Sequence, residues 1–513
     1  MHSRKSINIV WFKRDLRLVD HAPLQAALKH DLPILPLYMI EPEYWQQKTS
    51  SSRHWSFIYD SLSELNENCK RLGQPLTFRI GEAVDVLREL LQLHQIHSVF
   101  AHEETGNLWT FRRDQDVASF CAEHNIKFEE FSRDGVVRRL KNRDYWSQLR
   151  QERMHQNILP APNALRPIPD IDAGILPSKD HPLFVHKADG KTQKGGRSAG
   201  LALVDEFIKH RSSRYLKAIS SPIMGPDFSS RLSSHLTWGT LSEREVVQKL
   251  SYAYGLLNPG HFNRRGIRAV LTRLSWRSHF MQKLEDQPDL ESKSMHPFYE
   301  GLRPEGENTA TRLSAWEEGK TGFPIIDACM RFLRHEGWLP FRMRAMLVSF
   351  ASYHLWIDWR LTAPHLARLF TDYEPGIHYS QFQMQSGVTG INTMRVYNPL
   401  KQSYDHDPQG EFIKSNIPEL AHLPSEWLHE VNNIPPLIAA EFGFKIGHDY
   451  PHPIVENMTA MRDAKNKMTA IKKRDGFEKT AASVFKKLGS RNRPSSPQKR
   501  SPKKPSHDQL DLF

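Results

Sequence analysis

The sequence predicts an α/β N-terminal domain with a doubly wound parallel sheet, followed by an all-α domain. Two observations predict the sheet: short apolar runs rich in β-branched residues recur up to about residue 132, and helical patterns lie between them. The third observation concerns the rest of the chain, where helical spacing dominates from residue 201 onward. With 513 residues, of which 39% are hydrophobic, the chain is long enough for two or more packed units.

In the N-terminal part, strands are expected at the runs "INIVWF", "LPILPLYMI", "PLTFRI", "HSVFAH" and "IKFEEF". Helices are expected at intervening patterns such as "HWSFIYDSLSELNENCKRL" and "EAVDVLRELLQLH". The short connections predict a parallel sheet covered on both faces, which we assign to residues 1–132. No GxGxxG motif follows the first run, so the sheet need not hold a nucleotide in the manner of that motif.

The remaining chain divides by composition. Residues 133–200 are rich in Pro, Gly and polar side chains, which predicts a connector over the surface. Residues 201–460 are expected to form the helical domain, in which a helix from Pro324 to a stop at Gly337 is the clearest element. Residues 461–513 are expected to be a basic, largely disordered tail that ends in "QLDLF".

Charge and cysteine content narrow the class of protein. The formal net charge is +12, of which residues 465–513 carry +10 and the rest only +2. Any affinity of the folded part for DNA must therefore come from a local patch, while the tail attracts phosphates generally. Three cysteines are too few for a disulfide framework, which favours a reducing cytoplasm. The apolar runs are too short for a signal peptide or a membrane span.

Two segments suggest an anion site. Ser229, Ser230 and Ser233 with Arg231 bring hydroxyls and a guanidinium together, which suits a diphosphate; overlapping helix N-caps are the alternative interpretation. The stretch "EEGKT" lacks the first Gly of a phosphate-binding loop. No HExxH motif or CxxC cluster is present, so no catalytic metal is expected.

Arg342 and Arg344 precede a nearly continuous apolar helix. Guanidinium groups at such an edge need acidic partners or anionic ligands, and Asp372 and Glu374 are the candidates. A purely structural ion pair is the alternative. Trp276 lies in a helical stretch beside Arg277, where a lone Trp is most often a core residue.

Several stretches, taken together and in order, resemble the photolyase and cryptochrome family. They are "NIVWFKRDLRLVDHAPLQAAL", "SSRLSSHLTWGTLS", "LSAWEEGKTGFPIIDACMRFLRHEGWLPFRMR", "RVYNPLKQSYDHDPQGEFI" and "YPHPIVE". The chain is identified as a divergent bacterial member, a photolyase-like flavoprotein. The resemblance implies FAD in the helical domain and room in the α/β domain for a second, antenna chromophore of unknown identity.

The resemblance also implies roles for particular residues. The FAD phosphates would contact Tyr215 and the segment Ser229, Ser230, Arg231, Leu232 and Ser233. Arg344 and Asp372 would form an ion pair beside the flavin ring, with Arg277 and Glu374 in the same pocket. The position facing the flavin N5 atom falls near His378, with Gly376 as its rival.

The activity that the resemblance implies is light-dependent DNA repair by a deoxyribodipyrimidine photo-lyase. Reduced FAD would pass an electron to a pyrimidine dimer, with the cyclobutane type favoured and the (6-4) type open. A blue-light photoreceptor that signals is the alternative. Trp276 would stack on the lesion, and Arg342, Met384 and Arg395 would contact the DNA. Arg273 stands where repair enzymes carry a Glu, and we count it with Trp276 as catalytic.

The chain also departs from the family pattern. Phe382 stands where the first tryptophan of the photoreduction chain is expected, while Trp356 and Trp359 remain for another route. The iron–sulfur branch needs four Cys ligands and is excluded by the three present.

The last residues form a separate prediction. Gln509, Leu510, Leu512 and Phe513 look like the peptide by which bacterial DNA-processing proteins dock onto the sliding clamp of the replicase; chance is the alternative. We therefore expect a cytoplasmic, nucleoid-associated monomer whose partners are UV-damaged DNA and the clamp.

Overall fold

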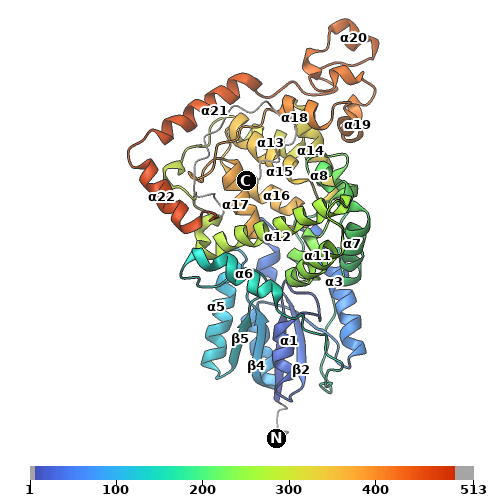
Figure 1. The fold of residues 1–513 in the computed structure, drawn as a ribbon, viewed down its shortest axis with the longest axis vertical. Helices are drawn as coiled ribbons and strands as arrows, with labels where there is room; N and C mark the ends of the chain where they lie inside the picture. Colours follow the sequence, from blue (N-terminus) through green and yellow to red (C-terminus); the bar gives the residue numbers. More distant parts are fainter. Residues whose placement is uncertain (1–5, 492–513) are drawn as a thin grey trace.

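The computed structural model describes residues 6–491 and places a parallel sheet at one end of the molecule and a helical region at the other (Figure 1). The strands follow the order β3-β2-β1-β4-β5, and all neighbours are parallel. Their bounds are β1 (Ser6–Phe12), β2 (Ile34–Ile40), β3 (Thr77–Ile80), β4 (Gln95–His102) and β5 (Lys127–Phe131). The predicted fold class is confirmed.

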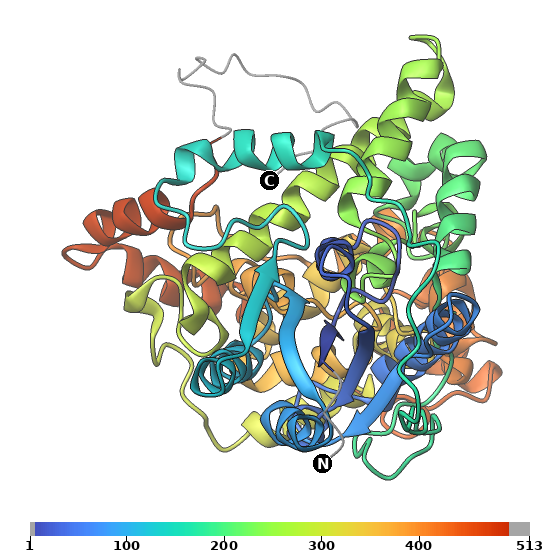
Figure 2. The same ribbon diagram turned by 90° about the horizontal axis from the view of Figure 1, so that it is seen from below.

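Side-chain alternation along β1 explains why both faces of the sheet are covered. Ile9 and Trp11 belong to one buried apolar cluster, whereas Val10 and Phe12 belong to another. The first cluster includes residues of α4 (Ala83–Leu93) and α5 (Leu108–Glu123), and the second those of α1 (Ala22–Leu28) and α3 (Ser52–Arg71). Figure 2 shows helices on both faces of the sheet. A short helix, α2 (Pro42–Trp45), follows β2.

The predicted connector is not wholly irregular. It contains η1 (Arg143–Tyr145) and α6 (Trp146–His155), after which no regular element appears up to Gly196. Leu165 and Phe184 are buried with the residues of α1 and α3, so the later part of this segment packs back onto the sheet region.

The helical region is built around α12 (Phe262–Asp286), which packs against α17 (Pro375–Gln385). A Cβ atom on Gly376 would lie 2.6 Å from the Cα atom of Met281, so glycine is what allows α17 to approach α12 this closely. The predicted helix from Pro324 is present as α14 (Pro324–Glu336), and Gly337 follows it in the left-handed conformation.

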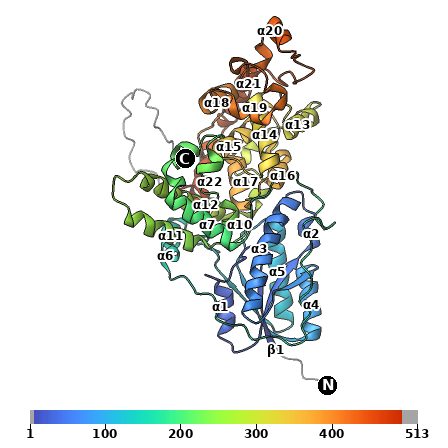
Figure 3. The same cartoon turned by 90° about the vertical axis from the view of Figure 1, so that its right-hand side faces the viewer.

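The other helices of this region are α7 (Arg197–Lys209), α8 (Tyr215–Ala218), α9 (Gly225–Phe228), α10 (Ser233–Thr237), α11 (Glu243–Leu256), α13 (Thr309–Glu318), α15 (Phe341–Ser349), α16 (Trp359–Leu369), α18 (Pro399–His406), α19 (Glu411–Asn416) and α20 (Pro436–Glu441). Shorter helical segments are η2 (Arg211–Ser213), η3 (Pro288–Glu291), η4 (Pro297–Tyr299), the π-helical turn η5 (Phe350–His354), η6 (Pro418–Leu420), η7 (Ser425–Trp427) and η8 (Val431–Asn433). Figure 3 shows these helices stacked above the sheet region.

The prediction of a largely disordered tail from residue 461 is wrong for residues 461–488. This segment lies in α21 (Asn457–Lys472) and α22 (Phe477–Leu488). Met468 and Ile471 are buried in the main core, and the ring of Phe477 stacks on His296 with centroids 4.2 Å apart. These two helices were not predicted because their apolar residues, although at helical spacing, stand among many lysines. Gln509, Leu510, Leu512 and Phe513 lie outside the described residues.

Among residues 6–491, no helix is long and apolar enough to cross a membrane. The domain boundaries at residues 132, 200 and 460 stay predictions.

Candidate functional site

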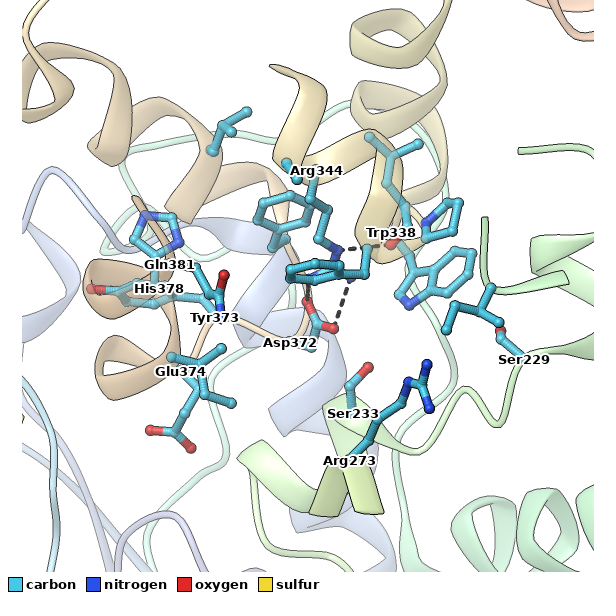
Figure 4. A pocket seen from close by; sticks show the side chains of 18 of the residues that line it. Ser229, Ser233, Arg273, Trp338, Arg344, Asp372, Tyr373, Glu374, His378 and Gln381 are labelled. Atoms are coloured by element: carbon cyan, nitrogen blue, oxygen red, sulfur yellow. Dashed lines mark hydrogen bonds and ion pairs between the residues drawn. The ribbon is translucent and has the colours of Figure 1, made fainter. Parts of the chain in front are cut away.

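A cavity opens in the helical region between α8, α12, α15 and α17, and Figure 4 shows its inner part. The inner part has a volume of about 270 Å³ and the outer part, which reaches the surface, about 1090 Å³. Tyr215, Ser233, Arg273, Arg344 and Asp372 line both parts, so the two are continuous. Together they have the size of a site for a large cofactor and a substrate beside it.

The predicted hydroxyl segment forms one wall of this cavity. Ser229 is 7% exposed, and its Oγ atom has no hydrogen-bond partner among the described residues. Arg231 follows with a φ of 53°, and its guanidinium lies over the ring of Trp338 at 4.4 Å. Burial lowers the pKa of Arg231 to about 10. A buried hydroxyl without a partner among the described residues, beside a guanidinium, suits an anionic ligand.

Leu232, in the middle of this segment, lines the outer part of the cavity. Its side chain is 1% exposed and belongs to an apolar cluster with Tyr215 and Leu274. Leu232 therefore anchors the hydroxyl segment to α12.

The predicted pair of Arg344 and Asp372 is confirmed as a bidentate ion pair. The guanidinium donates to both carboxylate oxygens, at 3.0 and 2.9 Å, and its Nε donates to the carbonyl of Leu339 at 2.7 Å. Burial alone would raise the pKa of Asp372, but Arg344 and the Ser233 hydroxyl hold it below its ordinary value. Asp372 is therefore a charged group at neutral pH inside the cavity.

Glu374 lies on the same wall and connects the cavity to the sheet region. Its carboxylate accepts a hydrogen bond from Arg277 at 2.9 Å and lies 3.4 Å from Arg133 and 3.6 Å from Arg14. Arg14 follows β1 and Arg133 follows β5, so one carboxylate joins three parts of the chain. Arg342 does not pair with Glu374; its guanidinium lies 5.6 Å from the ring of Tyr397.

Trp276 forms the wall of the outer part. It is half-buried on α12 and stacks on Phe280, with ring centroids 5.8 Å apart and an interplanar angle of 29°. Both rings line the outer part, together with the exposed Lys217 and Arg265 and the half-buried Arg342. Such a stacked aromatic pair with cations around it is able to hold a planar base of a nucleic acid.

His378, rather than its rival Gly376, lines the inner part. The Nε2 atom of His378 lies 2.9 Å from the carbonyl oxygen of Ala363, so it carries the proton and donates. Burial lowers the pKa of His378 to about 3, so the ring is neutral and Nδ1 is left as an acceptor. Gly376 packs against Met281 instead.

Only one of the next three predicted residues lines the cavity. Phe382 lines the inner part, whereas Met384 is 9% exposed and lines neither part. Arg395 is half-buried, its carbonyl accepts from Ser349, and it also lines neither part. Their contacts with DNA stay predictions. Trp359 is buried, with its ring 6.3 Å from that of Tyr379.

Residues that the sequence did not suggest also line the cavity, among them Trp338, Tyr373, Gln381, Lys217 and Arg265. Gln381 lies one helical turn after His378 on α17, so helical periodicity could have found it. No local signal marks Trp338 or Lys217, because each reaches the cavity through the packing of separate elements.

The crevice at the carboxyl ends of β1, β2 and β4 is the place where open parallel sheets commonly bind ligands. Here Arg113 donates to Glu41, Glu104 and Asp114, each at 2.8 Å. The position of an antenna chromophore in this chain stays a prediction.

Comparison with known proteins agrees with this geometry. Residues 8–141 match the family model described as DNA photolyase, and residues 270–470 match the FAD binding domain of DNA photolyase. The chain is 28% identical to a cryptochrome DASH of Gloeobacter violaceus, over 87% of this chain and 93% of that protein. It is 27% identical to a deoxyribodipyrimidine photo-lyase of Alkalihalophilus pseudofirmus, over 90% of this chain and 98% of the relative.

The fold resembles the crystal structure of a bacterial class III photolyase from Agrobacterium tumefaciens. The TM-score is 0.79 at 23% identity, and the match covers 92% of this chain and 99% of the other. At this identity the likeness shows a shared fold.

Proposed function

Because this chain belongs to the photolyase and cryptochrome family, we propose that it is a deoxyribodipyrimidine photo-lyase that repairs pyrimidine dimers in light, with the cyclobutane type as the first substrate. One observation carries the proposal above all: the inner part of the cavity is continuous with an outer part that is walled by Trp276 and open to the surface. An aromatic surface in the path between cofactor and solvent suits a base that stacks there, which favours repair of DNA over signalling.

The residues of the inner part fit FAD, the cofactor of the family. Ser229 offers a buried hydroxyl without a partner, and Arg231 offers positive charge for phosphates. Val348, Leu366 and Phe370 provide apolar wall for a ring system. When bound in its reduced form, FAD supplies the light-excited electron that opens the dimer.

The polar side chains hold this pocket in one arrangement. The bidentate pair of Arg344 and Asp372 fixes both side chains, since each loses two hydrogen bonds if it moves. His378 presents Nδ1 as a neutral acceptor for an N–H group of a ligand. The apolar wall excludes water, which strengthens these interactions.

Trp276 and the cations that line the outer part would position the DNA. A lesion must leave the helical stack to reach the cavity, and this costs less for a damaged base pair. The rings of Trp276 and Phe280 then offer a stacking surface. Lys217, Arg265 and Arg342 would contact backbone phosphates, which position the duplex without reading its sequence.

The test of the function is a repair assay. Photoreduced protein and UV-damaged oligonucleotide, lit with blue light, should recover absorbance at the pyrimidine band. Two substrates, one with a cyclobutane dimer and one with a (6-4) lesion, separate the lesion classes. No recovery with either substrate would refute repair and favour a photoreceptor.

Replacing Trp276 by alanine should weaken binding of dimer-containing oligonucleotide by about 10- to 100-fold, because aromatic stacking contributes roughly 1–3 kcal/mol per base. FAD content should stay at the wild-type level, since Trp276 lines only the outer part. Fluorescence anisotropy with a labelled oligonucleotide measures the change. The matched variant Trp276→Phe keeps a ring and should bind within a few-fold of wild type; equal weakening in both variants would speak against stacking.

The C-terminal peptide would connect the enzyme to the sliding clamp. Deleting Gln509 to Phe513 should abolish clamp capture in a pull-down, while replacing Lys503 and Lys504 by glutamine should leave capture nearly intact. Capture that survives the deletion would rule out this attachment. The protein without these five residues should repair an oligonucleotide at the wild-type rate, because the peptide would determine where the enzyme is recruited and not how fast it repairs a lesion.

A further inference from the structure

We propose that Arg273 is a ligand of the FAD diphosphate, and that its positive charge serves the cofactor rather than the lesion. The inference rests on FAD as the cofactor and not on the repair activity. It differs from the role that the sequence suggests, in which Arg273 acts with Trp276 on the dimer.

The first observation is that Arg273 has no carboxylate partner. On the same cavity wall Arg277 pairs with Glu374 and Arg344 pairs with Asp372. Among residues 6–491, no carboxylate lies within ion-pair distance of Arg273. Its guanidinium donates to the carbonyl of Ala269 at 3.0 Å and lies 5.4 Å from the ring of Tyr215. A half-buried guanidinium in such a position calls for an anion from outside the chain.

The second observation concerns the facing side chains. Ser229 is 7% exposed, so 93% of its surface is buried. Its Oγ atom has no hydrogen-bond partner among the described residues. Figure 4 shows Arg273, Ser229 and Ser233 on the same side of the inner part. A buried hydroxyl without a partner destabilises the folded chain, so a ligand atom is expected to complete it.

One ligand with several oxygens satisfies both groups. Guanidinium presents paired N–H donors whose geometry matches phosphate oxygens, and a hydroxyl donates to the same group. The diphosphate of FAD carries both the charge and the oxygens that these residues lack.

A lesion explains these residues less well. Ser229 lines only the inner part, whereas Trp276 lines only the outer part. DNA that stacks on Trp276 would therefore leave the hydroxyl of Ser229 without a partner. Arg273 lines both parts, whereas the hydroxyl without a partner, that of Ser229, lines the inner part, where the cofactor is expected.

The test compares FAD release from the full-length holoprotein for Arg273→Met and Arg273→Lys, with Arg268→Met as the control. Arg268 is an exposed residue on the same helix that lines neither part of the cavity. Released FAD is followed by its fluorescence at 50 and 200 mM salt. Loss of a charged hydrogen bond, about 1.5–3 kcal/mol, predicts release about 10- to 100-fold faster in Arg273→Met.

The charge-retaining Arg273→Lys should lie between wild type and Arg273→Met, and Arg268→Met should release FAD at the wild-type rate. Salt should speed release from wild type more than from Arg273→Met, because the lost interaction is electrostatic. Wild-type release from Arg273→Met would overturn the proposal, whether or not its affinity for damaged oligonucleotide falls. If Arg273→Met fails to fold, as judged by circular dichroism, the comparison of Arg273→Lys with wild type decides, and unchanged release would again overturn it.

Discussion

Replacing Glu374 by alanine should lower the free energy of unfolding by about 3–5 kcal/mol, because it removes the carboxylate from a buried ion cluster and leaves the guanidinium groups behind. The carboxylate is 2% exposed and lies between the guanidinium groups of Arg277, Arg133 and Arg14. Of these three, Arg14 would lose its ion pair and keep, among residues 6–491, the carbonyl of Tyr373, the ring of Trp238 and the attraction of Glu104. A poorly compensated charge in this position weakens the attachment of the helical region to the sheet.

The change is measured as the shift in the urea midpoint by circular dichroism, at a fixed excess of FAD for all proteins. The excess matters because a bound ligand stabilises the folded chain. Glu374→Gln keeps the volume of the side chain but not its charge, and it should lose less stability than Glu374→Ala. The control is Glu67→Ala, which breaks the exposed pair with Lys70 and should cost at most about 1 kcal/mol. A Glu374→Ala midpoint equal to that of the control would contradict the buried-cluster argument.

The folded protein should lose stability steeply as the pH falls from 6.5 to about 5, because several buried histidines stay neutral. Burial lowers the pKa of these rings to about 3 or about 4: His102 and His378 to about 3, and His54, His235 and His354 to about 4. In the unfolded chain a histidine takes up its proton near pH 6.5. Below that pH the unfolded chain therefore binds more protons, so acid favours unfolding.

Two buried carboxyl groups act in the opposite direction. Burial raises the pKa of Glu41 to about 7 and that of Asp327 to about 6. Both hold a proton in the folded protein at a pH where the unfolded chain has released it, so they favour the folded state at pH 5. These two carboxyl groups offset only part of the effect of the histidines, so a fall in pH still favours the unfolded chain.

Urea midpoints at pH 7, 6 and 5, in a fixed excess of FAD, measure this dependence. His354→Gln removes one titrating ring and should reduce the slope by about one proton, or about 1.4 kcal/mol per pH unit. His448→Gln changes a side chain that is 75% exposed and should leave the slope as it is. Midpoints that stay constant from pH 7 to pH 5 would show that the buried histidines do not control acid stability.

The same residues show how far the amino-acid sequence reaches toward the site. Arg344 and the hydroxyl segment at Ser229 were recognisable, because both belong to stretches with a family pattern. Asp372 was a candidate because a guanidinium at the edge of a buried helix needs an acidic partner or an anionic ligand. The contact of Arg342 with the ring of Tyr397 was not recognisable from the sequence, because the two residues come from separate parts of the chain. The two helices after residue 456 were missed, because Met468 and Ile471 are scattered among lysines and only the core that receives them reveals their spacing.

Local patterns were sufficient for the alternation of strands and helices, because apolar periodicity of 2 or 3.6 residues is written in neighbouring positions. Local motifs were also sufficient to identify the flavin-binding family. The electrostatic surroundings of Glu374 came only from folding, because its three arginines lie at positions 14, 133 and 277. The same holds for Arg273: which anion it faces depends on where α12 brings it relative to Ser229, and packing between distant segments sets that distance.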